Sequence, residues 1–349
     1  MSSLHSCTEK RFLVIGCGSI GKRHTRNLLS LGVKNIVAFD VQRARRAEVE
    51  QEFGIETLGS LDAAWAWRPY VCLVTAPTSL HVNLARSAVE QGAHVFIEKP
   101  LSHEWVGVER LLDLVARRSV ITLVGCNLRF HPGLRKIQEL LRQNAVGRVI
   151  AARVAVGQYL PDWHPWEDYR KTYSARRDLG GGVILDAIHE IDYVRWLLGE
   201  VTNTVCFAGK LSKLEIDTED TAAILLRFQN GAFGEVHLDY VQRAYSRTCQ
   251  IIGDEGTIHW DFAAGQVRFY SSQDQRWSGF VNPAGWEMNQ MYLDEMAHFL
   301  SCIDGREAPE SNVFDAAKVL QIALAAKASA TEKRWIEFGS PHWQTSAIL

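Results

Sequence analysis

The sequence predicts an α/β protein with two domains. Residues 1–126 are expected to form a doubly wound parallel sheet, and residues 127–349 an α+β domain with a large, open, mostly antiparallel sheet. Three observations predict this fold class. A chain of 349 residues exceeds what one hydrophobic core usually organises. The first third alternates short apolar segments with helical ones, as parallel sheets with crossover helices do. The remainder places long alternating segments in direct succession, which is typical of antiparallel strands.

The strands of the first sheet are predicted from short apolar runs without alternation, which indicate burial on both faces. These runs are residues 11–15, 35–39, 70–74, 94–97 and 120–124. The crossover helices are predicted at residues 22–31, 43–52 and 80–91.

The second sheet is predicted from segments in which apolar residues alternate with polar ones: residues 148–156, 204–209, 221–228, 232–240 and 257–262. Gln229-Asn230-Gly231 and residues 253–256 carry the signals of tight turns between antiparallel strands. Helices are expected to flank this sheet at residues 183–198, 287–302 and 315–331.

The composition is typical of a soluble globular protein and excludes several classes of partner. A net charge of −2 provides no basic field for nucleic acid or an anionic membrane. No apolar run reaches the length of about 18 residues that spans a bilayer. The chain begins with a short polar stretch that lacks the pattern of a secretory signal. Seven scattered cysteines without a CxxC pair indicate reduced thiols in the cytoplasm and no metal site.

A glycine-rich loop follows the first predicted strand and opens the first helix. It reads Gly16-Cys17-Gly18-Ser19-Ile20-Gly21, which is the GxGxxG pattern in the context that gives this pattern its meaning. The first glycine permits a tight turn, the second lets the backbone approach a pyrophosphate, and the third packs the helix on the strand. The first domain is therefore predicted to be a dinucleotide-binding (Rossmann) domain.

Asp40 ends the second strand, 19 residues after Gly21. A carboxylate at this place accepts hydrogen bonds from both hydroxyls of the adenosine ribose and repels a 2′-phosphate, which favours NAD over NADP. Arg43 lies three residues later and keeps NADP open as the less favoured alternative.

The stretch His94 to Ser102, HVFIEKPLS, predicts a buried strand that ends directly in a carboxylate and an ammonium group, Glu98 and Lys99. On this stretch alone, a solvated ion pair before a turn and a functional pair are equally reasonable interpretations. Ligands of doubly wound sheets bind at the carboxyl ends of the strands, which is where these two side chains are predicted to lie.

Taken together, these motifs resemble the glucose–fructose oxidoreductase / inositol dehydrogenase (Gfo/Idh/MocA) family. The resemblance covers nearly the whole chain in the same order: GCGSIG, Asp40, Thr75-Ala76-Pro77-Thr78 with His81, Glu98-Lys99-Pro100, Asn127 to Pro132, Gly180-Gly181-Gly182, and His189-Glu190-Ile191-Asp192. It implies a nicotinamide-dependent enzyme that transfers hydride to or from a secondary hydroxyl of a sugar, nucleotide sugar or cyclitol. Trp163 to Arg170 is most similar to members associated with surface-polysaccharide and amino-sugar pathways.

The resemblance also implies the catalytic residues. Lys99 would hydrogen-bond the reacting oxygen and stabilise its developing charge, and Pro100 would follow it through a cis peptide bond. His189 would accept the hydroxyl proton, oriented by Asp186. These two residues are three apart on a predicted helix, which places them on one face. The family more often places the aspartate four residues before this histidine, whereas Asp186 lies three residues before His189, so Glu190 is an alternative partner for His189.

The remaining site residues follow from the same resemblance. Cofactor contacts are expected at Gly16, Gly18, Ser19, Ile20, Gly21, Asp40, Thr75, Ala76, Pro77, Thr78, His81, Glu98, Lys99, Asn127 and Arg129. Substrate contacts are expected at Lys99, Arg129, His131, Trp163, His164, Tyr169, Asp186 and His189, with Arg170 as a further candidate. The family implies a homodimer or homotetramer formed through the open sheet.

Three other functions stay open at this point. One is a relative that holds NAD tightly for a transient oxidation within a non-redox reaction, such as glycosidic cleavage or epimerisation. Another is a biliverdin-type reductase, which needs no lysine and histidine for proton transfer. The third is a non-catalytic NAD-binding module, which the complete set Lys99, Asp186 and His189 disfavours.

Overall fold

The structure is a computed structural model that describes residues 6–339. It divides into two compact units. The first unit comprises the chain up to Asn127 together with residues 287–317, and the second comprises residues 128–286 together with the chain from Lys318 onward.

The first unit contains a six-stranded sheet in which every strand pairing is parallel, in the order β3-β2-β1-β4-β5-β6. Its strands are β1 (Arg11–Ile15), β2 (Asn35–Phe39), β3 (Glu56–Leu58), β4 (Val71–Val74), β5 (His94–Ile97) and β6 (Thr122–Val124). The strand order reverses between β1 and β4, which is the place where doubly wound sheets bind their ligands. The predicted doubly wound sheet is confirmed, and β3 is an additional short strand at its edge.

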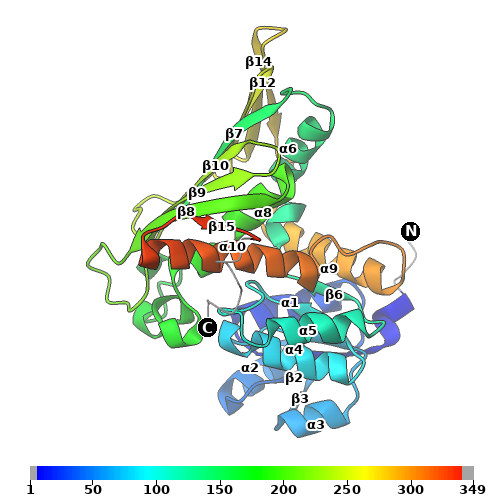
Figure 1. Cartoon of the computed structure of the whole chain (residues 1–349). Coiled ribbons are helices and arrows are strands. Elements are labelled where there is room, and N and C mark those ends of the chain that lie inside the picture. Colours follow the sequence, from blue (N-terminus) through cyan, green and yellow to red (C-terminus); the bar gives the residue numbers. More distant parts are fainter. Residues whose placement is uncertain (1–5, 340–349) are drawn as a thin grey trace. The chain divides into compact units, whose positions relative to one another are not determined.

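Five helices that connect these strands are labelled in Figure 1. They are α1 (Ser19–Ser30), α2 (Arg43–Phe53), α3 (Leu61–Ala66), α4 (His81–Glu90) and α5 (Val108–Ala116). The strands β4 and β5 are buried at every residue because helices cover the sheet. The sequence pattern predicted α1, α2 and α4 but not the shorter α3 and α5.

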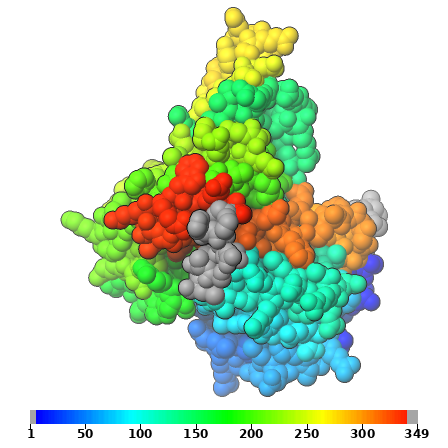
Figure 2. Space-filling view, in the orientation of Figure 1, coloured from blue at the N-terminus to red at the C-terminus, as the bar shows by residue number. Residues whose placement is uncertain are grey.

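A late segment of the chain returns to the first unit. Helix α9 (Asn289–Ile303) places Met296, Phe299 and Leu300 in the same hydrophobic core cluster as Phe12 and Phe96. Figure 2 shows this segment in orange beside the teal surface of the residues that precede Asn127 in the same unit. The expectation that residues 127–349 form one continuous second domain therefore differs from the observed units, because burial of these apolar side chains draws residues 287–317 onto the first core.

The second unit is built on a nine-stranded sheet in the order β14-β13-β12-β11-β7-β10-β9-β8-β15. Only β7 and β10 pair in parallel, and all other neighbours are antiparallel. The strands are β7 (Val149–Gly157), β8 (Val201–Gly209), β9 (Thr221–Phe228), β10 (Phe233–Asp239), β11 (Ser246–Gly253), β12 (Gly256–Asp261), β13 (Gln266–Ser271), β14 (Arg276–Val281) and β15 (Ile336–Glu337). The predicted open, mostly antiparallel sheet is confirmed, with β11, β13, β14 and β15 in addition.

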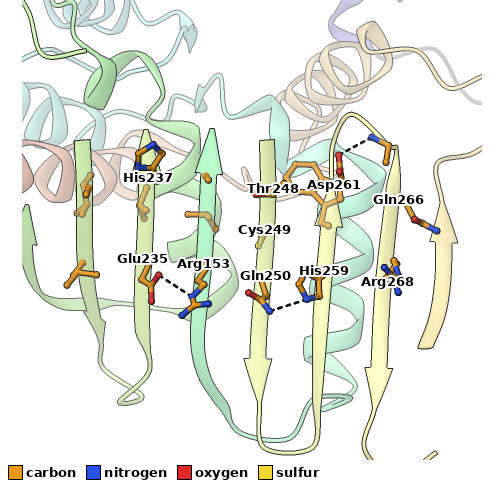
Figure 3. Close-up of a pocket in the computed structure, with 18 of the residues that line it drawn as sticks. Arg153, Glu235, His237, Thr248, Cys249, Gln250, His259, Asp261, Gln266 and Arg268 are labelled. Carbon is orange, nitrogen blue, oxygen red and sulfur yellow. Dashed lines mark hydrogen bonds and ion pairs between the residues drawn. The ribbon is translucent and has the colours of Figure 1, made fainter. Parts of the chain in front are cut away.

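One face of this sheet is covered by helices and the other carries polar and apolar side chains outward. Strand β9 alternates strictly, with Ala222, Ile224 and Leu226 buried and the residues between them exposed. The helices of this unit are α6 (Pro132–Arg142), α7 (Val183–Asp186), α8 (His189–Leu198) and most of α10 (Val313–Glu332). Figure 3 shows the outward side chains of Arg153, Glu235, Gln250, His259 and Arg268 in a row across neighbouring strands.

Two local features bear on the site. The predicted helix 183–198 is in fact two helices, because Ala187 ends α7 with a backbone ψ of 31° and α8 begins at His189. Within residues 6–339, no helix is long and apolar enough to cross a membrane.

Candidate active site

The glycine loop joins β1 to α1 in the first unit. Gly16 has a φ of 106°, and a Cβ there would lie 2.6 Å from the carbonyl oxygen of Thr75. A Cβ on Gly21 would overlap the carbonyl oxygen of Gly16. At Gly18, in contrast, the nearest atom to such a Cβ is 4.0 Å away, so the glycine leaves open space at the helix start. No side chain caps α1 at this end. Backbone N–H groups facing open space at a helix N-terminus fit the pyrophosphate of a dinucleotide.

Asp40 follows β2 and is 6% exposed. Its carboxylate accepts hydrogen bonds from the backbone N–H groups of Cys17 and Gln42, each at 2.8 Å. The carboxylate therefore stiffens the glycine loop, and each oxygen has a further lone pair for a ribose hydroxyl. The cation beside it is Arg45, whose guanidinium nitrogen lies 3.9 Å from Asp40 Oδ2. The sequence had suggested Arg43 for this position.

The segment after β4 lies against the glycine loop. The Thr75 hydroxyl donates to the carbonyl oxygens of Ile15 and Gly16, at 3.0 and 2.8 Å. Thr78 is buried as well, whereas Ala76 is half-buried and Pro77 is exposed. Of this predicted cofactor-binding stretch, Ala76 and Pro77 are therefore the residues that a ligand can reach.

Lys99 lies just past β5, between two residues that are themselves held. Glu98 is 8% exposed, and its Oε1 lies 2.6 Å from His24 Nε2 on α1. Its Oε2 accepts the backbone N–H of Lys99 at 3.2 Å. Burial alone would raise the pKa of Glu98, but the hydrogen bond and charge of His24, with the charge of Lys99, lower it overall. The Lys99–Pro100 peptide bond is cis, which confirms that expectation.

The first unit thus brings together most of the residues predicted to bind the cofactor, and it adds one that sequence reasoning missed. His24 comes three residues after the last glycine of the loop, on the buried side of α1. This position in the helical repeat was the available signal. Asn127 is 3% exposed and begins the short 3₁₀ helix η3 (Asn127–Phe130) after β6.

In the second unit, Asp186 ends α7 and is 3% exposed. It accepts hydrogen bonds from three hydroxyls: Tyr173, Ser174 at 2.7 Å and Tyr240 at 3.0 Å. Sequence reasoning missed all three donors, since nothing in the local pattern links them to Asp186. The glycine run explains how they come so close: a Cβ on Gly181 would overlap the carbonyl oxygen of Tyr173. Only a glycine lets the backbone of residues 173–176 pack against the start of α7.

His189 is the first residue of α8 and is 9% exposed. The expectation that Asp186 and His189 share a face of one helix is wrong in its premise, because the helix is broken between them. Glu190, the alternative partner of His189, is 0% exposed and lies 2.8 Å from Arg247 Nε on β11. The ion pair of the Glu190 carboxylate with Arg247 thus links α8 to strand β11.

Two predicted ligand contacts are instead buried in the second unit. Arg129 is 1% exposed and donates to Asp192 through two nitrogens, at 2.9 and 2.5 Å. His131 is 0% exposed, and its Nδ1 accepts the N–H of Gly133 at the start of α6. Burial and the charge of Arg247 lower the pKa of His131 to about 4. Neither side chain is accessible to a ligand in this structure, because Arg129 is buried in its ion pair with Asp192 and His131 is buried against α6.

The aromatic segment after β7 meets the hydrogen-bonded group around Asp186 through Trp163. Trp163 is half-buried and meets the ring of Tyr240 edge-on at 5.4 Å. His164 is exposed beside the ring of Trp166, at 5.3 Å between centroids. Tyr169 accepts the backbone N–H of Glu215 through its hydroxyl. Arg170, the further candidate for a substrate contact, forms ion pairs with Asp168 and Glu215.

Comparison with known protein families is consistent with this geometry. Residues 10–126 match the model of an oxidoreductase family with an NAD-binding Rossmann fold. Residues 134–259 match the C-terminal domain model of the same family. The chain belongs to the GFO/IDH/MocA family of oxidoreductases. The predicted class, an oxidoreductase with an NAD-binding Rossmann domain, is thereby confirmed.

Individual members of the GFO/IDH/MocA family match along nearly their whole length. The myo-inositol 2-dehydrogenase of Thermotoga maritima is 29% identical over 342 residues, which cover 94% of this chain and 98% of the relative. A levoglucosan dehydrogenase solved with NADH and levoglucosan superposes with a TM-score of 0.86 at 20% identity, covering 95% of this chain and 100% of that one. The WlbA dehydrogenase from Bordetella pertussis, solved with NADH and UDP-GlcNAcA, gives 0.81 at 21%, covering 95% and 99%. At these identities the two solved structures show the shared fold.

Proposed function

We propose that this protein is an NAD-dependent dehydrogenase that oxidises, or in reverse forms, a secondary hydroxyl of a sugar, nucleotide sugar or cyclitol. The observation that carries the proposal is the position of Lys99. It follows β5 at the carboxyl edge of the parallel sheet, in the same unit as a glycine loop that fits a dinucleotide. Asp40 favours NAD over NADP because its carboxylate would repel a 2′-phosphate.

The proposed reaction assigns a separate task to each of the proposed catalytic residues. Bound NAD would supply the acceptor for the hydride that leaves the substrate carbon. Lys99 donates a hydrogen bond to the substrate oxygen on which negative charge develops. Neutral His189 accepts the hydroxyl proton, and the carbon–oxygen single bond becomes a carbonyl. Asp186, held ready by three hydroxyl donors, supplies the negative charge that supports this proton transfer.

The substrate class is proposed from the relatives. Their names include a myo-inositol dehydrogenase and a levoglucosan dehydrogenase, and one related structure holds a nucleotide sugar. Inositol, levoglucosan and a nucleotide sugar all carry several ring hydroxyl groups. Trp163, His164 and Tyr169 are proposed to contact such a substrate, because they lie on the segment that leads to Tyr173 and Asp186.

A substrate screen tests the function. The purified protein is incubated with NAD and, separately, with NADP against inositols, free sugars and UDP-sugars, and formation of reduced cofactor is followed. We expect NADH formation with at least one polyhydroxylated substrate. A cofactor that survives desalting, with substrate turnover but no net NADH, would support transient oxidation in a non-redox reaction instead. If the protein binds NADH but none of the tested compounds gives NADH formation or substrate turnover, a non-catalytic NAD-binding module would be favoured.

We also propose that the protein is a homodimer or homotetramer in the cytoplasm, assembled through the uncovered face of the nine-stranded sheet. This face exposes Phe207, Leu225, Phe233 and Trp277, beside the ion pair of Arg153 with Glu235. Several large apolar side chains on one uncovered face are unusual for a surface in contact with water. Analytical ultracentrifugation of wild type and Leu225→Glu tests the assembly, and a monomeric wild type would refute it.

A further inference from the structure

The residues on either side of Lys99 are each held by a buried histidine. His24 lies 2.6 Å from the Glu98 carboxylate, whose other oxygen accepts the backbone N–H of Lys99. His81 Nδ1 lies 2.8 Å from the carbonyl oxygen of Pro100. Neither contact was predicted from the sequence, which offered His81 as a cofactor ligand.

These histidines cannot touch a ligand themselves. His24 is 0% exposed and His81 is 1% exposed. The second nitrogen of His81 faces the carbonyl oxygen of Ala76 at 2.8 Å, so its ring bridges the loop after β4 and the loop after β5. Any effect they have on a reaction must therefore pass through the residues that they hold.

The Glu98 carboxylate has little freedom to move away from His24. The His24 ring packs edge-on against Phe96 at 4.8 Å and faces Tyr292 at 6.2 Å. On the opposite side, a Cβ on Gly125 would come within 3.2 Å of the carboxylate. Packing therefore restrains both His24 and Glu98. The backbone N–H of Lys99 donates to the carboxylate that is restrained in this way.

The two contacts also connect Lys99 to both segments that a dinucleotide would touch. His24 belongs to α1, which follows the glycine loop, and His81 Nε2 lies 2.8 Å from the carbonyl oxygen of Ala76, a half-buried residue of the loop after β4. A lysine held from both sides by the cofactor-binding loops keeps a fixed position relative to the cofactor. Small displacements of catalytic groups reduce rates steeply.

We propose that His24 and His81 are positioning residues, which together fix Lys99 at the edge of β5 for its interaction with the substrate oxygen. This inference rests on the proposed function. It assigns a task to two buried histidines for which neither core filling nor cofactor contact gives an account.

The first test compares His24→Leu and His81→Leu with the conservative variants His24→Gln and His81→Gln, using NAD and a substrate found by the screen. We expect kcat of the leucine variants to fall roughly tenfold to a hundredfold. The dissociation constant of NADH should change by less than about threefold, and glutamine should restore part of kcat because it keeps an N–H donor. His94→Leu is the matched control: a buried histidine at the far end of the same strand, bonded to the Ile121 N–H, whose loss should leave kcat unchanged.

A double-variant comparison separates positioning from a general structural effect. If His24 acts through Lys99, His24→Leu adds no further loss of hydride transfer in a Lys99→Met background. Independent, multiplicative losses would overturn the proposal. A wild-type rate in Lys99→Met would instead contradict the proposed function of Lys99, which keeps the two failures apart.

A second measurement needs no substrate. The rate at which acetic anhydride modifies the Lys99 amine is measured by mass spectrometry on NADH-saturated protein. We expect His24→Leu and His81→Leu to change this rate about threefold or more relative to Lys22, because a released side chain samples other environments. His94→Leu should leave it unchanged. Equal rates in wild type and both leucine variants would overturn the proposal.

Discussion

Arg129 and Asp192 form a bidentate ion pair in which each side chain is only 1% exposed. The pair joins the 3₁₀ helix after β6 to α8, the helix that begins with His189. The guanidinium of Arg129 thus binds the helix that begins with His189, and this buried ion pair is the contact that the structure shows for it.

Breaking this pair should destabilise the protein strongly. Arg129→Met leaves the Asp192 carboxylate buried without its counter-ion, which typically costs about 3–5 kcal/mol. Urea unfolding monitored by tryptophan fluorescence measures the change. Arg148→Met, which removes a 3.9 Å ion pair at a side chain that is 78% exposed, is the control and should unfold like wild type. Similar stabilities of the two variants would show that Asp192 is paired adequately by other groups.

Cofactor selectivity should depend on Asp40. We expect NAD to bind at least about tenfold more tightly than NADP, a difference of about 1.4 kcal/mol. Asp40→Ser should narrow the gap, and it should also weaken NAD binding because the Cys17 and Gln42 N–H groups lose their acceptor. Isothermal titration with both cofactors decides this. Equal affinities in the wild type would mean that Arg45, beside Asp40, dominates, and Arg45→Ala would then restore selectivity.

Lys99→Met should separate chemistry from binding. The substitution keeps the length and apolar stem of the side chain but removes its charge and donors. Hydride transfer should fall about a hundredfold or more, the scale of losing one donor to the developing oxyanion. NADH affinity, measured by fluorescence, should change little. Collapse of NADH binding with intact turnover of bound substrate would make Lys99 a cofactor residue.

The partner of His189 can be decided by two amide substitutions. Asp186→Asn should lower hydride transfer while leaving the fold intact, because the amide oxygen still accepts hydrogen bonds from Ser174 and Tyr240 and the amide NH2 donates to the Tyr173 hydroxyl oxygen. Glu190→Gln should chiefly destabilise the protein, since it leaves Arg247 facing a neutral group. Thermal unfolding and single-turnover rates are measured for both. A silent Asp186→Asn with a slow but stable Glu190→Gln would assign the orienting role to Glu190.

His131 should make the protein acid-sensitive. Burial and the charge of Arg247 lower its pKa to about 4 in the folded protein, below its usual value of 6.5. Between pH 6.5 and 4, His131 is therefore protonated in the unfolded chain but neutral in the folded protein. The contribution of neutral His131 to the free energy of unfolding is about 3 kcal/mol. It is present above pH 6.5 and is lost as the pH falls toward 4.

The variant His131→Asn keeps an acceptor for the Gly133 N–H but does not titrate. Its stability should be lower at neutral pH, because the smaller side chain leaves space beside Trp260, and flatter between pH 6.5 and 4. His237→Asn is an informative control of opposite sign. The hydrogen bond to Asp239 raises the pKa of His237, so its contribution is present at low pH and lost as the pH rises. Parallel stability curves for wild type and His131→Asn would contradict the assignment.

The sequence by itself determined the features that depend on local pattern. Apolar runs predicted the parallel strands, the GxGxxG spacing predicted the dinucleotide loop, and alternation predicted the antiparallel sheet. These signals suffice because burial of a strand and the turn of a glycine loop are set by residues next to each other in the chain. The position of Lys99 after β5 belongs to the same class.

Only the tertiary structure decided which polar side chains hold which. His24 meets Glu98 across 74 positions, and Arg129 meets Asp192 across 63. No periodicity reports such pairs, because a buried charged or polar group takes whichever partner the packed fold brings within hydrogen-bond distance. The break between Asp186 and His189 has the same origin, since the glycine run beneath residues 173–176 shapes α7. The sequence could therefore name candidate site residues, whereas burial and long-range pairing determined which of these side chains are exposed and which are held by others.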